Sequence, residues 1–289
     1  MIMLAIKEEK TISIPRSSEW YPKEWEALPD APSTLYAYGN IELLKERKFV
    51  IVGARRTPKN ILKLGADIAK SISKSFVVVT GCAEGGDSAA IEGALSSGGR
   101  IICLLPGGFS ALPQGLPLLE QVAKRGLLLS PHPFETEIRT FSYGYRNKLL
   151  AALGEGTLVL AAGEKSGTLI TAKFAKKFGK RVFAIPYPPF SDVGAGCNAL
   201  IKNGAFLTEN AEDIANKFGI VLEEEKEMIL TDSERNIYGY LQQEGEGHVT
   251  EMALALGVPA FKLTGSLSAL EMKGCIVSLG GNRYGIVKK

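Results

Sequence analysis

Short, almost continuous apolar runs alternate with helical patterns through most of the chain, and this alternation most narrows the possible folds. Strands separated by helices, and apolar on both faces, are typical of a parallel sheet covered on both sides. The sequence therefore predicts an α/β fold, a Rossmann-like, doubly wound and mostly parallel sheet. The predicted strands are 49–53, 76–80, 100–105, 127–129, 157–161 and 181–185, and the predicted helices are 60–74, one starting near 84, 116–124, 145–153 and 169–178.

A charged segment, 221–228, marks a boundary after this sheet. Beyond it, helices are predicted at 234–243, 249–256 and 259–273, and short strands at 275–279 and 283–287. Three helices followed by a hairpin are typical of a winged helix. We therefore predict a Rossmann-like domain at 1–220 with an N-terminal lead-in at 1–47, a linker at 221–230 and a small C-terminal winged-helix domain at 231–289.

Composition excludes several classes of site. The four cysteines, at 82, 103, 197 and 275, form no CxxC pair, and there are only two histidines, His132 and His248. The sequence therefore has too few suitably spaced cysteines and histidines to favour a zinc site, a disulfide framework or a His-based triad. We expect no metal and no cofactor. The charged N-terminus lacks the apolar core of a signal peptide, and no segment is long and apolar enough to span a bilayer. We expect a cytoplasmic protein without a membrane partner.

Charge is unevenly distributed along the chain. Of the 34 Lys/Arg and 31 Asp/Glu residues, 7 and 10 lie at 221–289, which leaves 27 and 21 at 1–220. A polyanion should therefore prefer the large domain, although this imbalance is also within the range of an ordinary solvated surface. The tail carries a net charge of −3, which favours a protein-interaction or regulatory module over a duplex-DNA reader.

Three small-residue turns follow predicted strands, where helix N-termini offer free N–H groups to anions. They are 52–56, 80–87 and 165–168. Each alone is equally explained as a turn that needs glycine for its geometry, but three of them with added arginines favour an anion site. The residues expected there are Gly53, Arg55, Arg56, Gly81, Ser166, Gly167 and Thr168.

A fourth segment, 141–148, mixes aromatic rings with two cations and an amide. Aromatic faces beside basic groups suit unstacked bases and a phosphate backbone, so it predicts single-stranded DNA as the anion. The alternative is a loop of core aromatics and surface charges. The candidate contacts are Tyr143, Arg146, Asn147 and Lys148.

Nucleotide chemistry has weaker support. There is no GxxxxGK[ST] and no GxGxxG after the first strand, and the second strand ends in Thr80-Gly81 rather than in an acid for a ribose. Asp87 lies at the start of a helix, where capping is a better explanation than acid catalysis. These observations argue against an ATPase and a nicotinamide dehydrogenase.

Taken in order, these motifs resemble the DNA-processing protein A (DprA/Smf) family. The family patterns VG(S/A)R, SGxAxGID, FPxRNR, SGSLITA and GxNxLIxxGA correspond here to VGAR at 52–55, TGCAEGGD at 80–87, YGYRNK at 143–148, SGTLITA at 166–172 and GCNALIKNGA at 196–205. The resemblance implies sequence-tolerant binding of single-stranded DNA, a homodimer formed through the Rossmann-like domain, and delivery of a RecA-type recombinase in DNA uptake and recombination. It implies no enzymatic activity.

The chain departs from the family pattern at several positions. Ile91 stands where the family has His, and Tyr143, Gly144 and Lys148 replace Phe, Pro and the second Arg of FPxRNR. Ala161 ends a strand that commonly ends in an acid. The chain is therefore interpreted as a divergent member.

An enzyme is the main alternative. Pro106-Gly107-Gly108 resembles the start of the PGGxGTxxE motif of "lysine decarboxylase-like" (LOG) phosphoribohydrolases, which cleave nucleoside monophosphates. Here Phe-Ser-Ala-Leu-Pro follows Gly108, so the GT and the Glu are missing. That absence favours the DNA-binding hypothesis over the LOG-like one.

Overall fold

The computed structural model of the protein describes residues 6–112, 117–222 and 230–287. The chain divides into two compact units, Met1–Glu223 and Glu224–Lys289. Most of the predicted linker lies outside the described residues.

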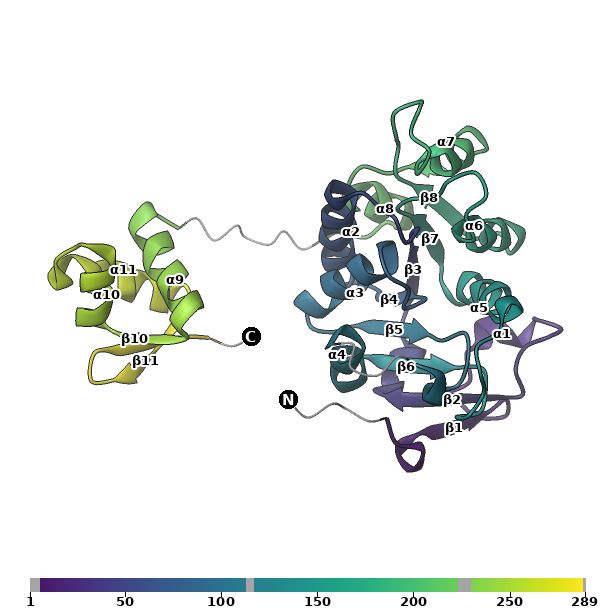
Figure 1. The fold of residues 1–289 in the computed structure, drawn as a ribbon, viewed down its shortest axis with the longest axis horizontal. Helices are drawn as coiled ribbons and strands as arrows, with labels where there is room; N and C mark the ends of the chain where they lie inside the picture. The colour runs from purple at the N-terminus through teal and green to yellow at the C-terminus, as the bar shows by residue number, and fades with distance from the viewer. Residues whose placement is uncertain (1–5, 113–116, 223–229, 288–289) are drawn as a thin grey trace. The chain divides into compact units, whose positions relative to one another are not determined.

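Among the described residues, the large unit contains one nine-stranded sheet in the order β1-β2-β6-β5-β4-β3-β7-β8-β9 (Figure 1). The strands from β6 to β9 in this order are all parallel. β2 pairs antiparallel with β6, and β1 with β2. The α/β, mostly parallel sheet is thus confirmed. The strands are β1 Ile12–Pro15, β2 Thr34–Gly39, β3 Lys48–Val52, β4 Val77–Thr80, β5 Ile101–Leu104, β6 Leu127–Ser130, β7 Gly156–Val159, β8 Arg181–Ala184 and β9 Phe206–Leu207.

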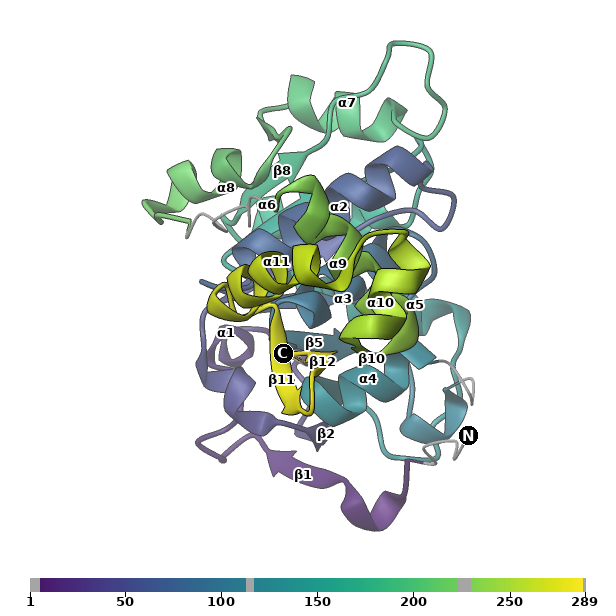
Figure 2. The same cartoon turned by 90° about the vertical axis from the view of Figure 1, so that its left-hand side faces the viewer.

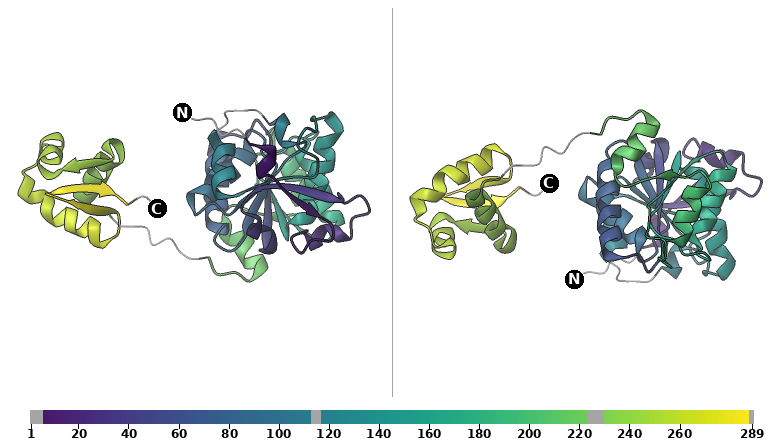
Figure 3. Two further views of the ribbon diagram at one scale, coloured as in Figure 1. Left: turned by 90° about the horizontal axis from the view of Figure 1, so that it is seen from below. Right: turned by 90° about the horizontal axis from the view of Figure 1, so that it is seen from above.

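Helices cover both faces of this sheet (Figure 3). Successive side chains of a strand point to opposite faces, and β3 shows this directly. Phe49 and Ile51 belong to the core beneath α2, α3, α4 and α8, while Val50 and Val52 belong to the core beneath α1, α5, α6 and α7. The helices are α1 Lys23–Glu26, α2 Lys59–Ile72, α3 Gly86–Ser96, α4 Pro117–Arg125, α5 Thr140–Leu153, α6 Thr168–Lys177, α7 Ala195–Lys202 and α8 Ala211–Phe218, with 3₁₀ turns at Glu8–Lys10, Ile41–Lys45 and Phe109–Ala111.

The strand order creates a switch point beside β3. The chain runs from β3 outward through β4, β5 and β6, and then returns to place β7 on the other side of β3. In open α/β sheets, ligands bind outside the carboxyl ends of the strands at such a point. A hydrogen bond of 2.9 Å from the Ala54 N–H to the Ala161 oxygen joins the segment that follows β3 to the segment that follows β7.

Two features differ from the sequence-based expectation. Residues 12–39 contribute two antiparallel strands to the sheet edge that we did not predict, since each is only partly buried. α5 begins at Thr140 and not at Tyr145, so the aromatic and basic segment 141–148 is helical.

The second unit has the predicted order of three helices and a hairpin, plus a short strand that we did not predict. Within residues 230–287, the strands form an antiparallel sheet in the order β10-β12-β11 (Figure 2). Its core includes Ile237, Met252 and Leu267. Winged helix remains our interpretation of this unit. Its elements are α9 Asp232–Glu244, β10 Glu246–His248, α10 Val249–Leu256, α11 Ala260–Met272, β11 Ile276–Gly280 and β12 Arg283–Ile286.

Candidate nucleic-acid interface

The turns after β3 and β4 pack directly on one another at the carboxyl edge of the sheet. The Gly86 N–H donates to the Ala54 oxygen at 3.3 Å. A Cβ on Gly53 would lie 2.7 Å from the Gly86 Cα, and one on Gly85, where φ is +85°, would lie 2.4 Å from the Ala54 oxygen. The glycines of these two turns are therefore required by the close approach of two backbones.

Asp87 fastens the same two turns together. Its buried carboxylate accepts the N–H of Gly53 through Oδ1 and the N–H of Ala83 through Oδ2, both at 3.2 Å. Burial raises the pKa of Asp87, and the nearby charge of Arg146 opposes that rise. Asp87 thus joins two turns and does not cap α3, whose N-cap is Gly85 without a side-chain hydrogen bond, so the helix-capping role expected for it is wrong.

Arg146 lies inside the protein, with 5% of its surface exposed. Its Nη1 donates to the carbonyl oxygens of Gly81 and of Leu104, the latter at 2.9 Å, and its Nε donates to the Asn147 Oδ1 at 2.9 Å. This interior position differs from the surface position that the predicted phosphate contact needs. The reason is helical phase, because Arg146 shares the buried face of α5 with Leu149, Leu150 and Leu153.

Gly81 leaves the space that the Arg146 guanidinium occupies. A Cβ there would lie 2.6 Å from the Arg146 Cζ and 2.8 Å from the Asp87 Oδ2. Arg146 therefore connects α5 to the end of β5 and to the turn after β4, and that turn is held in place by Asp87.

The groups left on the surface are aromatic and cationic. Arg55 and Arg56 are exposed in the turn after β3. On α5, Phe141 is 70% exposed and Tyr143 is 38% exposed, and the Tyr143 ring centroid lies 5.9 Å from the Arg146 Cζ. A series of contacts thus leads from Tyr143 to Arg146, from Arg146 to the turn after β4, and from that turn through Asp87 to the turn after β3 that carries Arg55.

Lys148 and Asn147 have partners within the protein. The Lys148 ammonium is ion-paired with Asp30, and the hydrogen bond from Lys148 lowers the pKa of that carboxyl. The Asn147 Nδ2 donates to the Gly167 oxygen at 3.2 Å, which joins α5 to the turn before α6. Part of the positive charge expected from Lys148 is therefore compensated by Asp30.

The turn before α6 uses part of its backbone internally. The Ser166 N–H donates to the Gly163 oxygen at 3.1 Å, and the Thr168 N–H is directed at the Ser166 Oγ at 3.3 Å. Gly167 is exposed, and so is Lys165 beside it. Lys165, like the exposed Arg139 just before α5, is a surface cation that our site prediction left out. Its position in the predicted turn 165–168 was the available signal.

The Pro106–Gly108 turn has a packing explanation. A Cβ on Gly107 would lie 2.7 Å from the Ile138 Cγ1, and one on Gly108 would lie 2.1 Å from the Phe134 oxygen. The two glycines let this turn lie against residues 133–138. Packing alone therefore explains the two glycines, without a phosphoribohydrolase motif.

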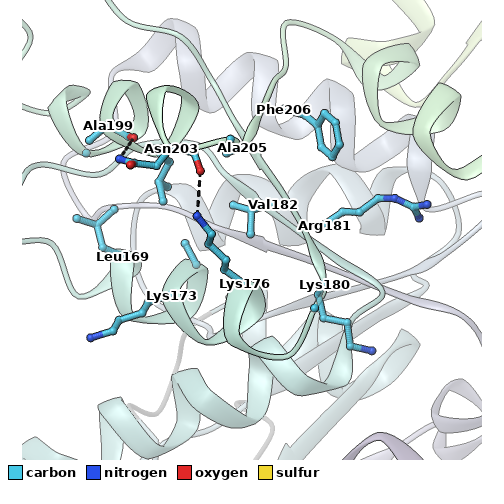
Figure 4. A pocket seen from close by; sticks show the side chains of 15 residues that line it. Leu169, Lys173, Lys176, Lys180, Arg181, Val182, Ala199, Asn203, Ala205 and Phe206 are labelled. Carbon is cyan, nitrogen blue, oxygen red and sulfur yellow. Dashed lines mark hydrogen bonds between the residues drawn. The ribbon is translucent and has the colours of Figure 1, made fainter.

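A separate cavity of about 530 Å³ lies between α6, α7, β8 and β9 (Figure 4). Its walls include apolar side chains, and Lys173, Lys176, Lys180 and Arg181 also line it. The Lys176 Nζ donates to the Asn203 oxygen at 3.0 Å. Because Arg181 begins β8, this basic cavity lies toward the amino end of that strand, away from the turns described above.

The described residues offer little to a metal site or to a membrane span. No group of three or more His, Cys, Asp or Glu side chains there could hold a metal ion. No single described helix is long and apolar enough to cross a membrane, and only the bent pair α10 and α11, at 111°, meets the length and composition criteria together.

Comparison with known proteins identifies the family. The sequence model of the DNA recombination-mediator protein A family matches residues 13–219. The DNA processing protein DprA of Bacillus subtilis (strain 168) is 36% identical over 217 residues, covering 74% of this chain and 73% of that protein. Protein Smf of Escherichia coli (strain K12) is 32% identical over 216 residues, covering 72% of this chain and 57% of that protein.

Solved structures agree. The X-ray structure of DprA from Streptococcus pneumoniae is similar with a TM-score of 0.68 and 31% identity, over 73% of this chain and 75% of that one. A structure of DprA from Helicobacter pylori, described as giving insight into a unique single-stranded DNA binding mode, has a TM-score of 0.64 and 27% identity, over 72% and 95%. The chain therefore belongs to the DNA recombination-mediator protein A family, which confirms the resemblance to DprA and Smf proteins seen in its motifs.

Proposed function

We propose that the large unit binds single-stranded DNA with little sequence preference at the carboxyl edge of its sheet, as part of DNA recombination or uptake. The observation that carries this proposal is the series of contacts from Tyr143 and Arg146, through the turn after β4 and Asp87, to the turn with Arg55 and Arg56. It holds exposed cations and exposed aromatic rings on one connected framework. Stacking platforms beside cations bind unstacked bases and phosphates without base-specific hydrogen bonds.

The proposed contacts divide by position. Arg55 and Arg56 bind phosphate, with the backbone around Gly53 and Ser166–Thr168 assisting, while Tyr143 offers a ring to a base. Arg146, Gly81 and Asn147 position these groups from within. Lys148 contributes once a phosphate competes with Asp30 for its ammonium.

The wider role follows the family. We propose that the protein acts as a homodimer and delivers a RecA-type recombinase to the bound strand in the cytoplasm. The support for these steps is family membership, since DprA and Smf proteins are the relatives found. The protein is then a binding and delivery factor and not an enzyme.

A competition experiment tests the DNA proposal. A labelled single-stranded oligonucleotide of mixed sequence is bound to the full chain, and unlabelled single-stranded and duplex competitors of equal length are titrated in. We expect the single strand to compete at least tenfold better than the duplex, and single strands of different sequence to compete alike. Equal competition by duplex, or no binding of the labelled strand, would contradict the proposal.

The LOG-like alternative has its own assay. Incubation with AMP should release no adenine above a buffer control, because the carboxylate of PGGxGTxxE is missing and the glycines pack on residues 133–138. Adenine release that rises with protein concentration and is lost in Asp87→Asn would support the enzyme instead.

A further inference from the structure

Two cysteines meet at the base of the turn after β4. In the register of β4 and β5, Thr80 lies opposite Cys103, and Cys82 follows Thr80 by two residues. Both side chains belong to the same hydrophobic cluster, with Cys103 among its buried members and Cys82 packed against it, and the two thiols are close enough to interact. The backbone of Cys82 has a φ of +60°, a left-handed conformation that is rare for a residue with a side chain.

The two thiols differ in access to solvent. Cys103 is fully buried, and burial together with the interaction with Cys82 and the charge of Asp87 raises its pKa. Cys82 is partly exposed. A dissolved oxidant therefore reaches Cys82 first, and Cys103 is placed behind it as a second thiol. In reversible oxidation sites, a solvent-accessible cysteine often lies next to a second thiol that can resolve it.

We propose that Cys82 and Cys103 form a reversible disulfide when the protein meets a hydroperoxide. The Cys82 sulfur attacks the distal oxygen of the peroxide, the O–O bond breaks, and the products are a sulfenic acid and water or an alcohol. The Cys103 sulfur then attacks the Cys82 sulfur, the S–O bond breaks, and water leaves. The peroxide is reduced by two electrons, and the two thiols are oxidised to one disulfide.

The disulfide also affects the DNA site, a consequence that rests on the proposed function. Cys82 lies between Gly81, whose carbonyl accepts Arg146, and Ala83, whose N–H donates to Asp87. Drawing its sulfur to bonding distance from Cys103 moves the turn that packs on Ala54 and Arg55. We expect single-strand affinity to fall at least threefold on oxidation and to return with a dithiol reductant.

Mass spectrometry tests the disulfide independently of DNA. The full chain is treated with a small molar excess of hydrogen peroxide, unfolded in the presence of an alkylating agent, and digested with and without reduction. We expect a reducible cross-link between the peptides of Cys82 and Cys103, and unmodified thiols at Cys197 and Cys275, which are buried elsewhere. The double variant Cys197→Ser, Cys275→Ser is the matched control and should form the same cross-link.

Single variants separate the two roles. In Cys103→Ser, Cys82 should pass to sulfinic acid because the second thiol is missing, and in Cys82→Ser, Cys103 should stay reduced because the oxidant cannot reach it. The proposal is overturned if wild type keeps four alkylated thiols, if its Cys82 becomes sulfinic acid without a cross-link, or if the cross-link joins two chains. A cross-link with unchanged DNA affinity supports the oxidation site and overturns only its effect on binding, whereas a reduced protein that never binds DNA contradicts the proposed function alone.

Discussion

The position of Arg146 in the structure differs from the one that its expected role requires. Its motif and its neighbours predict a phosphate contact, yet the guanidinium is buried and donates to the Gly81 and Leu104 carbonyl oxygens. The information that was missing is the phase of α5, which depends on a helix start at Thr140. A tolerated glycine, Gly144, lies in the first turns of this helix and obscured that start. Arg55, by contrast, is exposed as expected.

Replacing Arg146 should therefore lower stability before it lowers DNA affinity. Arg146→Ala leaves the buried Gly81 and Leu104 carbonyl oxygens without their donor and Asp87 without a nearby positive charge, and each unsatisfied buried group costs about 1–3 kcal/mol. We expect that loss in the free energy of unfolding by urea, with Arg55→Ala within about 0.5 kcal/mol of wild type as the control. If Arg146→Ala were as stable as wild type but bound single strands poorly, Arg146 would be a direct contact after all.

Glycine substitutions test the same framework from the other side. Gly81→Ala places a Cβ 2.6 Å from the Arg146 Cζ, and overpacking of this kind costs about 1–3 kcal/mol. Gly144→Ala, where no neighbouring atom lies within 4 Å, should stabilise α5 by about 0.5–1 kcal/mol because alanine loses less backbone entropy in a helix. In thermal and urea unfolding, Gly81→Ala should therefore be less stable than wild type and Gly144→Ala more stable. If Gly81→Ala were as stable as Gly144→Ala, the turn at Gly81 would have relaxed to make room for the added methyl group.

At the scale of elements, the central strands and the helices between them could be predicted from the apolar pattern. Strands that are buried on both faces appear in the sequence as continuous apolar runs, which are easy to recognise. The edge is harder to predict. In β1, only Ile14 is buried, and β2 alternates partly and fully buried residues, so neither resembles the continuous runs of the centre. β2 joins the sheet by pairing with β6, which is distant in sequence, and β1 is added through its pairing with β2.

An ion pair ties the start of β3 to the start of β7. The Arg47 Nε and Nη2 donate to the two Glu155 carboxylate oxygens at 2.9 and 2.7 Å, and this interaction lowers the pKa of Glu155. A carboxylate with a lowered folded-state pKa stabilises the fold above its unfolded pKa, about 4.3, and loses that contribution as pH falls through the folded value.

Glu155→Gln should therefore matter at neutral pH and not in acid. Because both side chains are partly exposed, we expect a loss of at most about 1 kcal/mol at pH 7. The difference from wild type should shrink below pH 4 and vanish where both proteins carry a neutral side chain at this position. Urea unfolding at a series of pH values measures it. A difference that stays constant into acid would assign the effect to packing and not to charge.

At the scale of the whole molecule, the proposed function assigns different roles to the two units. In the described part of the second unit, Arg235, Lys273 and Arg283 pair with Asp232, Glu234 and Glu246, at 3.1, 2.8 and 3.3 Å. A winged helix places the helix that corresponds to α11 in a major groove. The one cation within α11 is Lys262, and Lys273 follows the end of the helix. Cations engaged in this way gain little from phosphate, which supports a regulatory or protein-binding role for this unit.

Truncation tests that division. A chain ending at residue 220 should keep single-strand affinity within about tenfold of the full protein, about 1.4 kcal/mol, since the proposed contacts all lie in the large unit. Circular dichroism and gel filtration verify that the shortened chain is folded. Loss of DNA binding by a folded truncated chain would place the main contact in the second unit.

The most direct test of the central claim is the salt dependence of binding at two matched arginines. Fluorescence anisotropy with a labelled single strand is recorded from low to moderate salt for wild type, Arg55→Ala at the carboxyl edge and Arg181→Ala at the start of β8, both positions being exposed. We predict that Arg55→Ala binds more weakly and flattens the slope of log affinity against log salt by about 0.7, the value for one lost phosphate contact on a single strand. Arg181→Ala should keep the wild-type slope. An unchanged slope in Arg55→Ala, or a flattened slope in Arg181→Ala alone, would contradict a DNA site at the carboxyl edge of the sheet.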